Sequence, residues 1–115
     1  MKFSIIIAIV FGLLSMTLML IEANSTVWIH NKVTRGTWTH VSAAETKDGD
    51  SFDEDGDWAH HGYSVSIPNS VNSYWLKFSV TLSGEDNKWR GPILNNGDRC
   101  FHLHGTINTW KVFDC

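Results

Sequence analysis

Apolar and polar side chains alternate with a period of two along much of the chain after residue 24, a pattern typical of strands with one buried and one solvated face. In YSVSI, residues 63–67, three apolar side chains alternate with two serines. Residues 73–82 continue this pattern over a longer stretch, with one face formed by Tyr74, Leu76, Phe78, Val80 and Leu82. Shorter strands are indicated at 26–30, 37–41, 100–104 and 108–113. No convincing helical stripe follows residue 24, so we expect an all-β fold, a small antiparallel β-sandwich of six to seven short strands or a flattened barrel.

Residues 1–23 have the composition of a targeting segment rather than of a folded element. Lys2 precedes a long apolar stretch, and a small residue, Ala23, ends it. This arrangement is typical of a cleaved secretory signal peptide. The apolar stretch is also about long enough to cross a bilayer, so an uncleaved anchor stays open as the alternative. We expect residues 24–115 to form a single domain of a secreted, extracellular protein.

The overall charge argues against several classes of partner and activity. The chain has nine Lys and Arg residues and twelve Asp and Glu residues, which gives a net charge of −3. Without a basic patch, no nucleic-acid partner is expected.

The sequence also has no nucleophile elbow, no H-E-x-x-H motif and no glycine-rich phosphate loop. We therefore expect a protein that is not an enzyme and that needs no cofactor, with calcium as a possible ligand.

The two cysteines of the chain are Cys100 and Cys115. An even number of cysteines in a secreted protein usually forms disulfides. The single intramolecular pairing would close a loop of about sixteen residues and stabilise the fold by about 3 kcal/mol. Two free thiols are the alternative.

The stretch DGDSFDEDGDWAHH, residues 48–61, holds six carboxylates and two histidines. Glycines at 49 and 56 and the density of like charge predict an exposed loop over residues 48–57. Three interpretations stay open: a weak calcium site, a solvated charged loop, or a surface that faces a protein partner. The calcium ligands would be Asp48, Asp50, Asp53, Asp55 and Asp57.

Two further sets of side chains are candidates for binding. On a strand, His102 and His104 project from one side while Phe101 and Leu103 project inward, so the two imidazoles can start a zinc or copper site that His60 or His61 completes. The alternative is ordinary polar surface. The chain also has six tryptophans, more than a core of this size needs. Exposed ones suit sugars, lipid headgroups or protein interfaces, whereas buried ones would form a second small cluster. The candidate binding residues are Trp28, Trp58, Trp75, Trp89, His60 and His61.

The order TVWIHN, WTHVSA, KDGD, GYSVSI, YWLKFSV, DRC and TWKVFDC resembles the plant self-incompatibility protein family. That family has a cysteine directly after the histidine and another in the later aromatic strand, where this chain has Val41 and no cysteine. The resemblance implies a secreted β-sandwich that acts as a signalling ligand. The opening V-x-I-x-N strand and the abundance of aromatics are also similar to the aegerolysins, which implies recognition of membrane lipids.

Two functions follow from these patterns. The first is an extracellular signalling ligand or effector that contacts a protein receptor or surface. The alternative is a lectin-like or lipid-binding module whose exposed tryptophans contact a glycan or a lipid headgroup.

Overall fold

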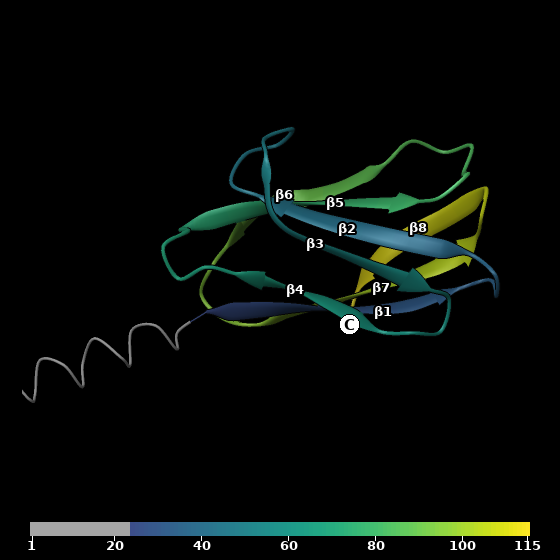
Figure 1. Cartoon of the computed structure of the whole chain (residues 1–115), viewed down its shortest axis with the longest axis horizontal. Helices are drawn as coiled ribbons and strands as arrows, with labels where there is room; N and C mark the ends of the chain where they lie inside the picture. The colour runs from purple at the N-terminus through teal and green to yellow at the C-terminus, as the bar shows by residue number, and fades with distance from the viewer. Residues whose placement is uncertain (1–23) are drawn as a thin grey trace, which may run out of the picture.

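A computed structural model describes residues 24–115, and the proposed signal segment 1–23 lies outside the described residues. The described chain forms eight strands and no helix (Figure 1). The strands are β1 (Ser25–Val33), β2 (Trp38–Ala44), β3 (Ser51–Trp58), β4 (Tyr63–Ile67), β5 (Ser73–Val80), β6 (Lys88–Leu94), β7 (Arg99–Thr106) and β8 (Thr109–Asp114). The predicted all-β sandwich is therefore confirmed. Within residues 24–115, no helix is long and apolar enough to cross a membrane.

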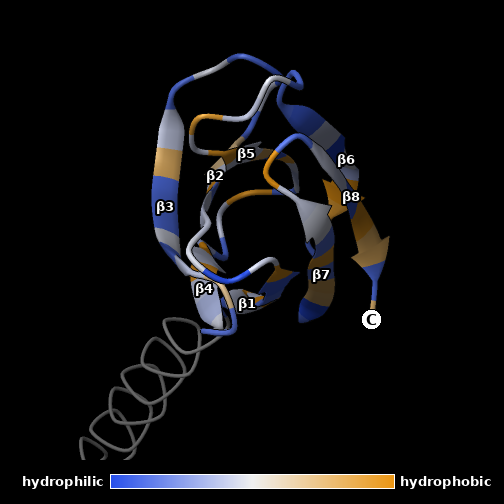
Figure 2. Cartoon of the chain, turned by 90° about the vertical axis from the view of Figure 1, so that its right-hand side faces the viewer, coloured by the Kyte–Doolittle hydropathy of each residue, from blue (hydrophilic) through white to orange (hydrophobic). Residues whose placement is uncertain are grey.

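The strands form two four-stranded sheets. The first sheet has the order β4-β1-β7-β8, and the second has the order β3-β2-β5-β6. All neighbours pair antiparallel except β1 and β7, which are parallel. Viewed toward one end, the two sheets enclose the core, with β3 beside β4 at one open side and β6 beside β8 at the other (Figure 2). At the second side, Arg90 Nη2 donates to the Val112 carbonyl at 2.8 Å.

The core is built from the alternate positions that the sequence pattern marks as inward. Strand β5 alternates half-buried and buried residues along its whole length, and β4 buries all three of its apolar positions. The largest fully buried side chains include Trp110, Tyr74 and Phe78. Leu82 follows the end of β5 with a positive φ of 66° and is exposed, so its predicted place on the buried face is wrong.

The prediction of an exposed loop over residues 48–57 is wrong for most of its length. A turn occupies residues 45–50, and β3 begins at Ser51 and pairs along its length with β2. Trp58 lies in β3 and Trp89 in β6, although the charged residues around each of them indicate a loop. Strands β3 and β6 raise the count from the predicted six or seven to eight. Both are edge strands, so neither needs the apolar alternation that marks a strand buried on one face.

The disulfide between Cys100 and Cys115 is present, as predicted. It connects β7 to the residue that follows β8, across 15 positions of sequence. The backbone supports the same contact, because the Cys115 amide donates to the Cys100 carbonyl at 3.3 Å.

Candidate functional site

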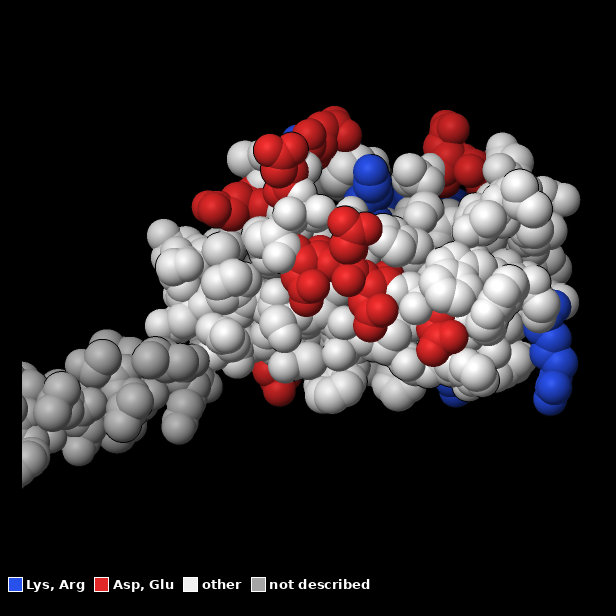
Figure 3. Space-filling model, viewed as in Figure 1, with Lys and Arg blue, Asp and Glu red and all other residues white. Residues whose placement is uncertain are grey.

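The open side between β3 and β4 carries a line of carboxylates that we call the acidic row: Asp53, Asp55 and Asp57. They pair with Ala43, Val41 and Thr39 of β2, all of which face the core. Directly paired residues of antiparallel strands share a face of the sheet. The acidic row therefore lies on the inner side of the second sheet, where β3 passes β4, and its carboxylates contribute to the acidic surface over β3 (Figure 3).

Each carboxylate of the acidic row accepts a hydrogen bond from the next amide along β3. The acceptor–donor distances are 2.9 Å to Glu54 N, 2.8 Å to Gly56 N and 2.7 Å to Trp58 N. These bonds satisfy outward amides of an edge strand that would otherwise be open to another strand. Asp53 also crosses to the first sheet, where its Oδ2 accepts from Ser66 N of β4 at 2.8 Å.

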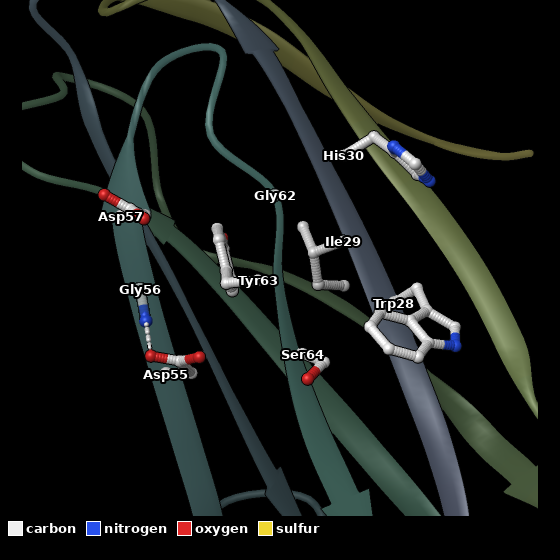
Figure 4. A pocket seen from close by; sticks show the side chains of 9 residues that line it. All are labelled: Trp28, Ile29, His30, Asp55, Gly56, Asp57, Gly62, Tyr63 and Ser64. Atoms are coloured by element: carbon white, nitrogen blue, oxygen red, sulfur yellow. Dashed lines mark hydrogen bonds between the residues drawn. The ribbon is translucent and has the colours of Figure 1, made fainter.

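A groove of about 500 Å³ runs along this side of the molecule. We call it the seam groove, and it is lined by Trp28, Ile29, His30, Asp55, Gly56, Asp57, Gly62, Tyr63 and Ser64. Strand β4 runs between β3 and β1 (Figure 4). The groove therefore has Gly62, Tyr63 and Ser64 along its middle, carboxylates from β3 on one side, and an indole and an imidazole from β1 on the other. Trp28 is 51% exposed, so its ring is available for contact.

Tyr63 supplies a neutral polar group beneath the carboxylates. Its hydroxyl lies 2.7 Å from Thr39 Oγ1, and both residues are buried. Burial raises the pKa of the Tyr63 phenol well above its ordinary value, and the negative charges of Asp55 and Asp57 raise it further. The phenol therefore stays protonated across the physiological range and keeps its hydrogen bond.

Buried Asn31 of β1 fixes one end of the groove. Its side-chain Nδ2 donates to the backbone carbonyl of Asp57 at 3.0 Å, and its backbone carbonyl accepts from His60 N at 2.6 Å. These two bonds hold the end of β3 and the following turn against β1. Sequence reasoning missed Asn31, although a polar residue at an inward position of an alternating strand was a usable signal.

The structure divides the six predicted binding residues among separate places. Trp28 lines the seam groove, whereas Trp58 lies on the other face of β3 against the edge of Trp38, with 5.1 Å between ring centroids. Trp75 and Trp89 lie on the outer face of the second sheet, where Lys47 Nζ is 5.7 Å and 5.5 Å from their ring centroids.

The two predicted histidines lie in the turn between β3 and β4. His60 adopts a positive φ of 71°, and His61 Nδ1 is 3.3 Å from Asp57 Oδ1. His60 also borders a smaller hollow beside His30. Sequence reasoning did not select His30, which the parallel pairing of β1 with β7 brings close to both cysteines.

The predicted metal ligands are not gathered into a cage. Asp48 and Asp50 lie in the turn before β3, and the acidic row is spread along the strand. Among residues 24–115, the one group of three or more possible ligands with atoms within 4.8 Å of one another is His30, Cys100 and Cys115. The calcium hypothesis therefore stays a prediction without a preformed cage to support it.

His102 and His104 project together, as predicted, above buried Phe101 and Leu103. Their ring centroids are 4.5 Å apart, with the edge of one ring against the face of the other. His60 and His61, expected to complete a metal site with them, form no such group of three with them among the described residues.

No protein-family model matches the sequence, and no curated protein sequence matches it either. Three solved structures show what the fold is similar to. An NMR structure of a protein from Eubacterium rectale has 13% sequence identity and a TM-score of 0.50, and the match covers 81% of this chain and 89% of that one. A crystal structure of wild-type pneumolysin has 14% identity and a TM-score of 0.48 over 80% of this chain. Suilysin from Streptococcus suis has 12% identity and a TM-score of 0.45 over the same share.

The match spans only 23% of the pneumolysin chain and 23% of the suilysin chain. At such low identity, the likeness to the Eubacterium rectale protein concerns the fold alone.

Proposed function

We propose that this chain is a small secreted, non-enzymatic binding protein, and that its seam groove holds an extended, positively charged segment of a protein partner. The observation that carries the proposal is the composition of the groove: exposed Asp55 and half-buried Asp57 on one side, an exposed indole on the other, and a strand edge between them. A secreted ligand is also what the resemblance to the plant self-incompatibility family implies.

The charge of the groove favours a cationic partner. Among residues 24–115, no Lys or Arg pairs with Asp55 or Asp57, and the one charged-group contact is that of His61 with Asp57. No Lys or Arg lines the groove. Uncompensated carboxylates attract basic groups and repel acidic ones, which raises the association rate and sets specificity.

The backbone of β4 favours an extended partner. Ser66 N points away from β1, because it donates to Asp53 on the other side. Outward amides recur at every second residue of an antiparallel edge strand, so Ser64 N points the same way. Ser64 lines the groove, and an incoming strand can pair with this edge while its side chains meet the two sides of the groove.

Secretion is supported by the disulfide. Bridges between cysteines persist in oxidising compartments and are rare in the cytosol. The composition of residues 1–23 points in the same direction.

The test is a set of extended peptides of equal length that differ in charge, titrated against the protein and followed by tryptophan fluorescence. We expect basic peptides to bind, with affinity that falls as salt rises, and acidic ones not to bind. Asp55→Asn with Asp57→Asn should weaken binding about tenfold or more, equivalent to about 1.4 kcal/mol. The matched control is Asp48→Asn with Asp50→Asn, which removes the same charge from the preceding turn. Equal loss in both double variants, or equal binding of acidic and basic peptides, would contradict the proposal.

A second candidate function is a lectin-like or lipid-binding module. It is favoured by the aromatic side chains on the outer face of the first sheet, where Trp28 is 51% and Phe113 44% exposed. Glycan arrays and liposomes test it directly. Saturable binding that Trp28→Ala abolishes and the Asp55/Asp57 double variant keeps would favour this module over the peptide groove.

A further inference from the structure

Three possible metal ligands meet on the outer face of the first sheet, away from the acidic row. A ring nitrogen of His30 and the Sγ atoms of Cys100 and Cys115 all lie within 4.8 Å of one another. The parallel pairing of β1 with β7 sets Trp28 opposite Cys100 and His30 opposite His102. The end of β8 then brings Cys115 back beside Cys100.

A second imidazole borders the same place. A hollow of about 280 Å³ is lined by His30, Lys32, His102 and Cys115. His102 Nε2 lies 3.1 Å from the Asp114 carbonyl. Because a carbonyl can only accept a hydrogen bond, Nε2 carries the proton, and Nδ1 of the neutral ring holds a lone pair.

Within the described residues, no hydrogen-bond donor contacts that lone pair. His102 Nδ1 is buried and finds no hydrogen-bond partner within residues 24–115. Histidines that bind metals commonly donate their other ring N–H to a backbone carbonyl, which fixes the tautomer and orients the ring. His102 has this arrangement.

We propose that reduction of the Cys100–Cys115 disulfide creates a zinc site formed by Cys100, Cys115, His30 and His102. The oxidised chain has a disulfide at this place, and the reduced chain has a Cys2His2 set. This site is independent of the proposed peptide groove, although His30 borders both.

The chemistry requires a reductant, either a dithiol or a phosphine. A dithiol forms its own disulfide and passes two electrons and two protons to the bridge, which opens to two thiols. A phosphine instead takes oxygen from one water molecule, whose two protons go to the thiols. Zn²⁺ then binds both thiolates and releases those two protons.

The geometry fits zinc because its bonds are short and tetrahedral, about 2.3 Å to sulfur and about 2.0–2.1 Å to nitrogen. The ring nitrogen of His30 and the two Sγ atoms lie within 4.8 Å of one another and need only small movements to share one ion. His102 borders the hollow beside them, and its ring must bring Nδ1 to the same point. Two thiolates neutralise the charge of Zn²⁺, so the nearby Lys32 is tolerated. Zinc would thus keep the segment after β8 attached to β7 when the covalent bond is broken.

Cobalt substitution tests the proposal on the full chain, reduced with a phosphine in the absence of oxygen. One equivalent of Co²⁺ should give thiolate-to-cobalt charge-transfer absorption in the near ultraviolet and the visible bands of a tetrahedral ion. Zn²⁺ should displace the cobalt. The oxidised protein should show neither signal.

Variants separate this site from adventitious binding. Cys100→Ser should remove about half of the charge-transfer absorption or more, and His30→Ala or His102→Ala should each raise the dissociation constant for Zn²⁺ about tenfold or more. The control is His104→Ala, which removes an imidazole from the next outward position of β7 and should change the constant less than about twofold, a difference of roughly 0.4 kcal/mol.

A second measurement covers the case in which the reduced chain unfolds. Zn²⁺ should protect both thiols from alkylation, restore the β-sheet circular dichroism and lose both effects on chelation. Thiols of an unfolded chain would bind metal without regard to which histidine is missing. Equal affinities for His30→Ala, His102→Ala and His104→Ala would therefore overturn the proposal, as would the absence of charge-transfer absorption in the reduced protein.

Discussion

Asp53 is one of the side chains that join the two sheets where β3 passes β4, so its removal should lower the stability of the whole fold. Its carboxylate accepts two amide hydrogen bonds, from Glu54 in its own strand and from Ser66 in β4. Asp53→Ala removes both bonds. A hydrogen bond to a charged group contributes about 1.5–3 kcal/mol, and Asp53 is half-buried, so solvent takes over part of the loss. We expect the free energy of unfolding to fall by about 1–2 kcal/mol.

The matched control is Asp55→Ala, which removes the same charge from the same strand. Asp55 accepts only from Gly56 N of its own strand, and water can replace that bond. We expect this variant to stay within about 0.5 kcal/mol of the parent protein. Asp53→Asn should fall between the two, because an amide keeps only one oxygen that can accept.

Urea denaturation followed by circular dichroism measures these differences. In a domain of this size, a loss of 1 kcal/mol corresponds to a fall in melting temperature of about 4–8 °C. If Asp53→Ala and Asp55→Ala have the same stability, then the bond to Ser66 contributes nothing and the reasoning fails.

Three other expectations can be checked on the unmodified protein. The pKa values of Tyr63 and Tyr74 are both raised, mainly by burial, so the two tyrosines ionise first in the unfolded chain and the stability of the fold decreases as the pH rises above about 10. Alkaline titration should show tyrosinate absorbance only together with loss of the β-sheet signal. Ionisation of either tyrosine in the folded protein would contradict this. Because the acidic row is not gathered into a cage, we expect equal melting temperatures with millimolar calcium and with chelator, whereas a rise with calcium would restore the calcium hypothesis. Residues 24–26, Asn-Ser-Thr, form an N-glycosylation sequon. We expect Asn24 to carry little or no glycan, because β1 begins at the next residue and Asn24 Oδ1 already accepts from Asn69 N. A glycosidase-sensitive mass shift would show the opposite.

The sequence predicted those elements in which one face is buried and the other is solvated. Residues 63–67 and 73–80 form strands with the alternation expected, and the paired cysteines form their bridge. In the two strands, the buried apolar positions recur with the period of a β-strand, so the sequence pattern alone is sufficient to predict the element.

The sequence pattern did not predict strands β3 and β6, and both show the limit of the apolar alternation as a signal. In β3 the inward positions hold carboxylates and not apolar side chains. The reason is that β3 is an edge strand at an open side of the sandwich, where its side chains meet solvent and hydrogen-bond donors such as Ser66 N. In β6 the Gly91–Pro92 pair indicates a turn by local propensity, yet an edge strand tolerates proline, and Gly91 leaves room for the ring of Trp75. The seam groove combines β1 with β3 and β4, which lie far from β1 in sequence, so no short motif could reveal it.

The parallel contact between β1 and β7 has a consequence for how the chain folds. β1 lies inside the first sheet, and its two neighbours are β4, which begins at Tyr63, and β7, which begins at Arg99. It has no partner nearby in sequence, so β1 must wait for β4 on one side and for β7 on the other. Long-range pairing of this kind slows folding and prolongs the exposure of unpaired edges. The first sheet should therefore assemble only after residues 99–114 have been synthesised, and a chain shortened before residue 99 should leave one edge of β1 open to pairing with other chains.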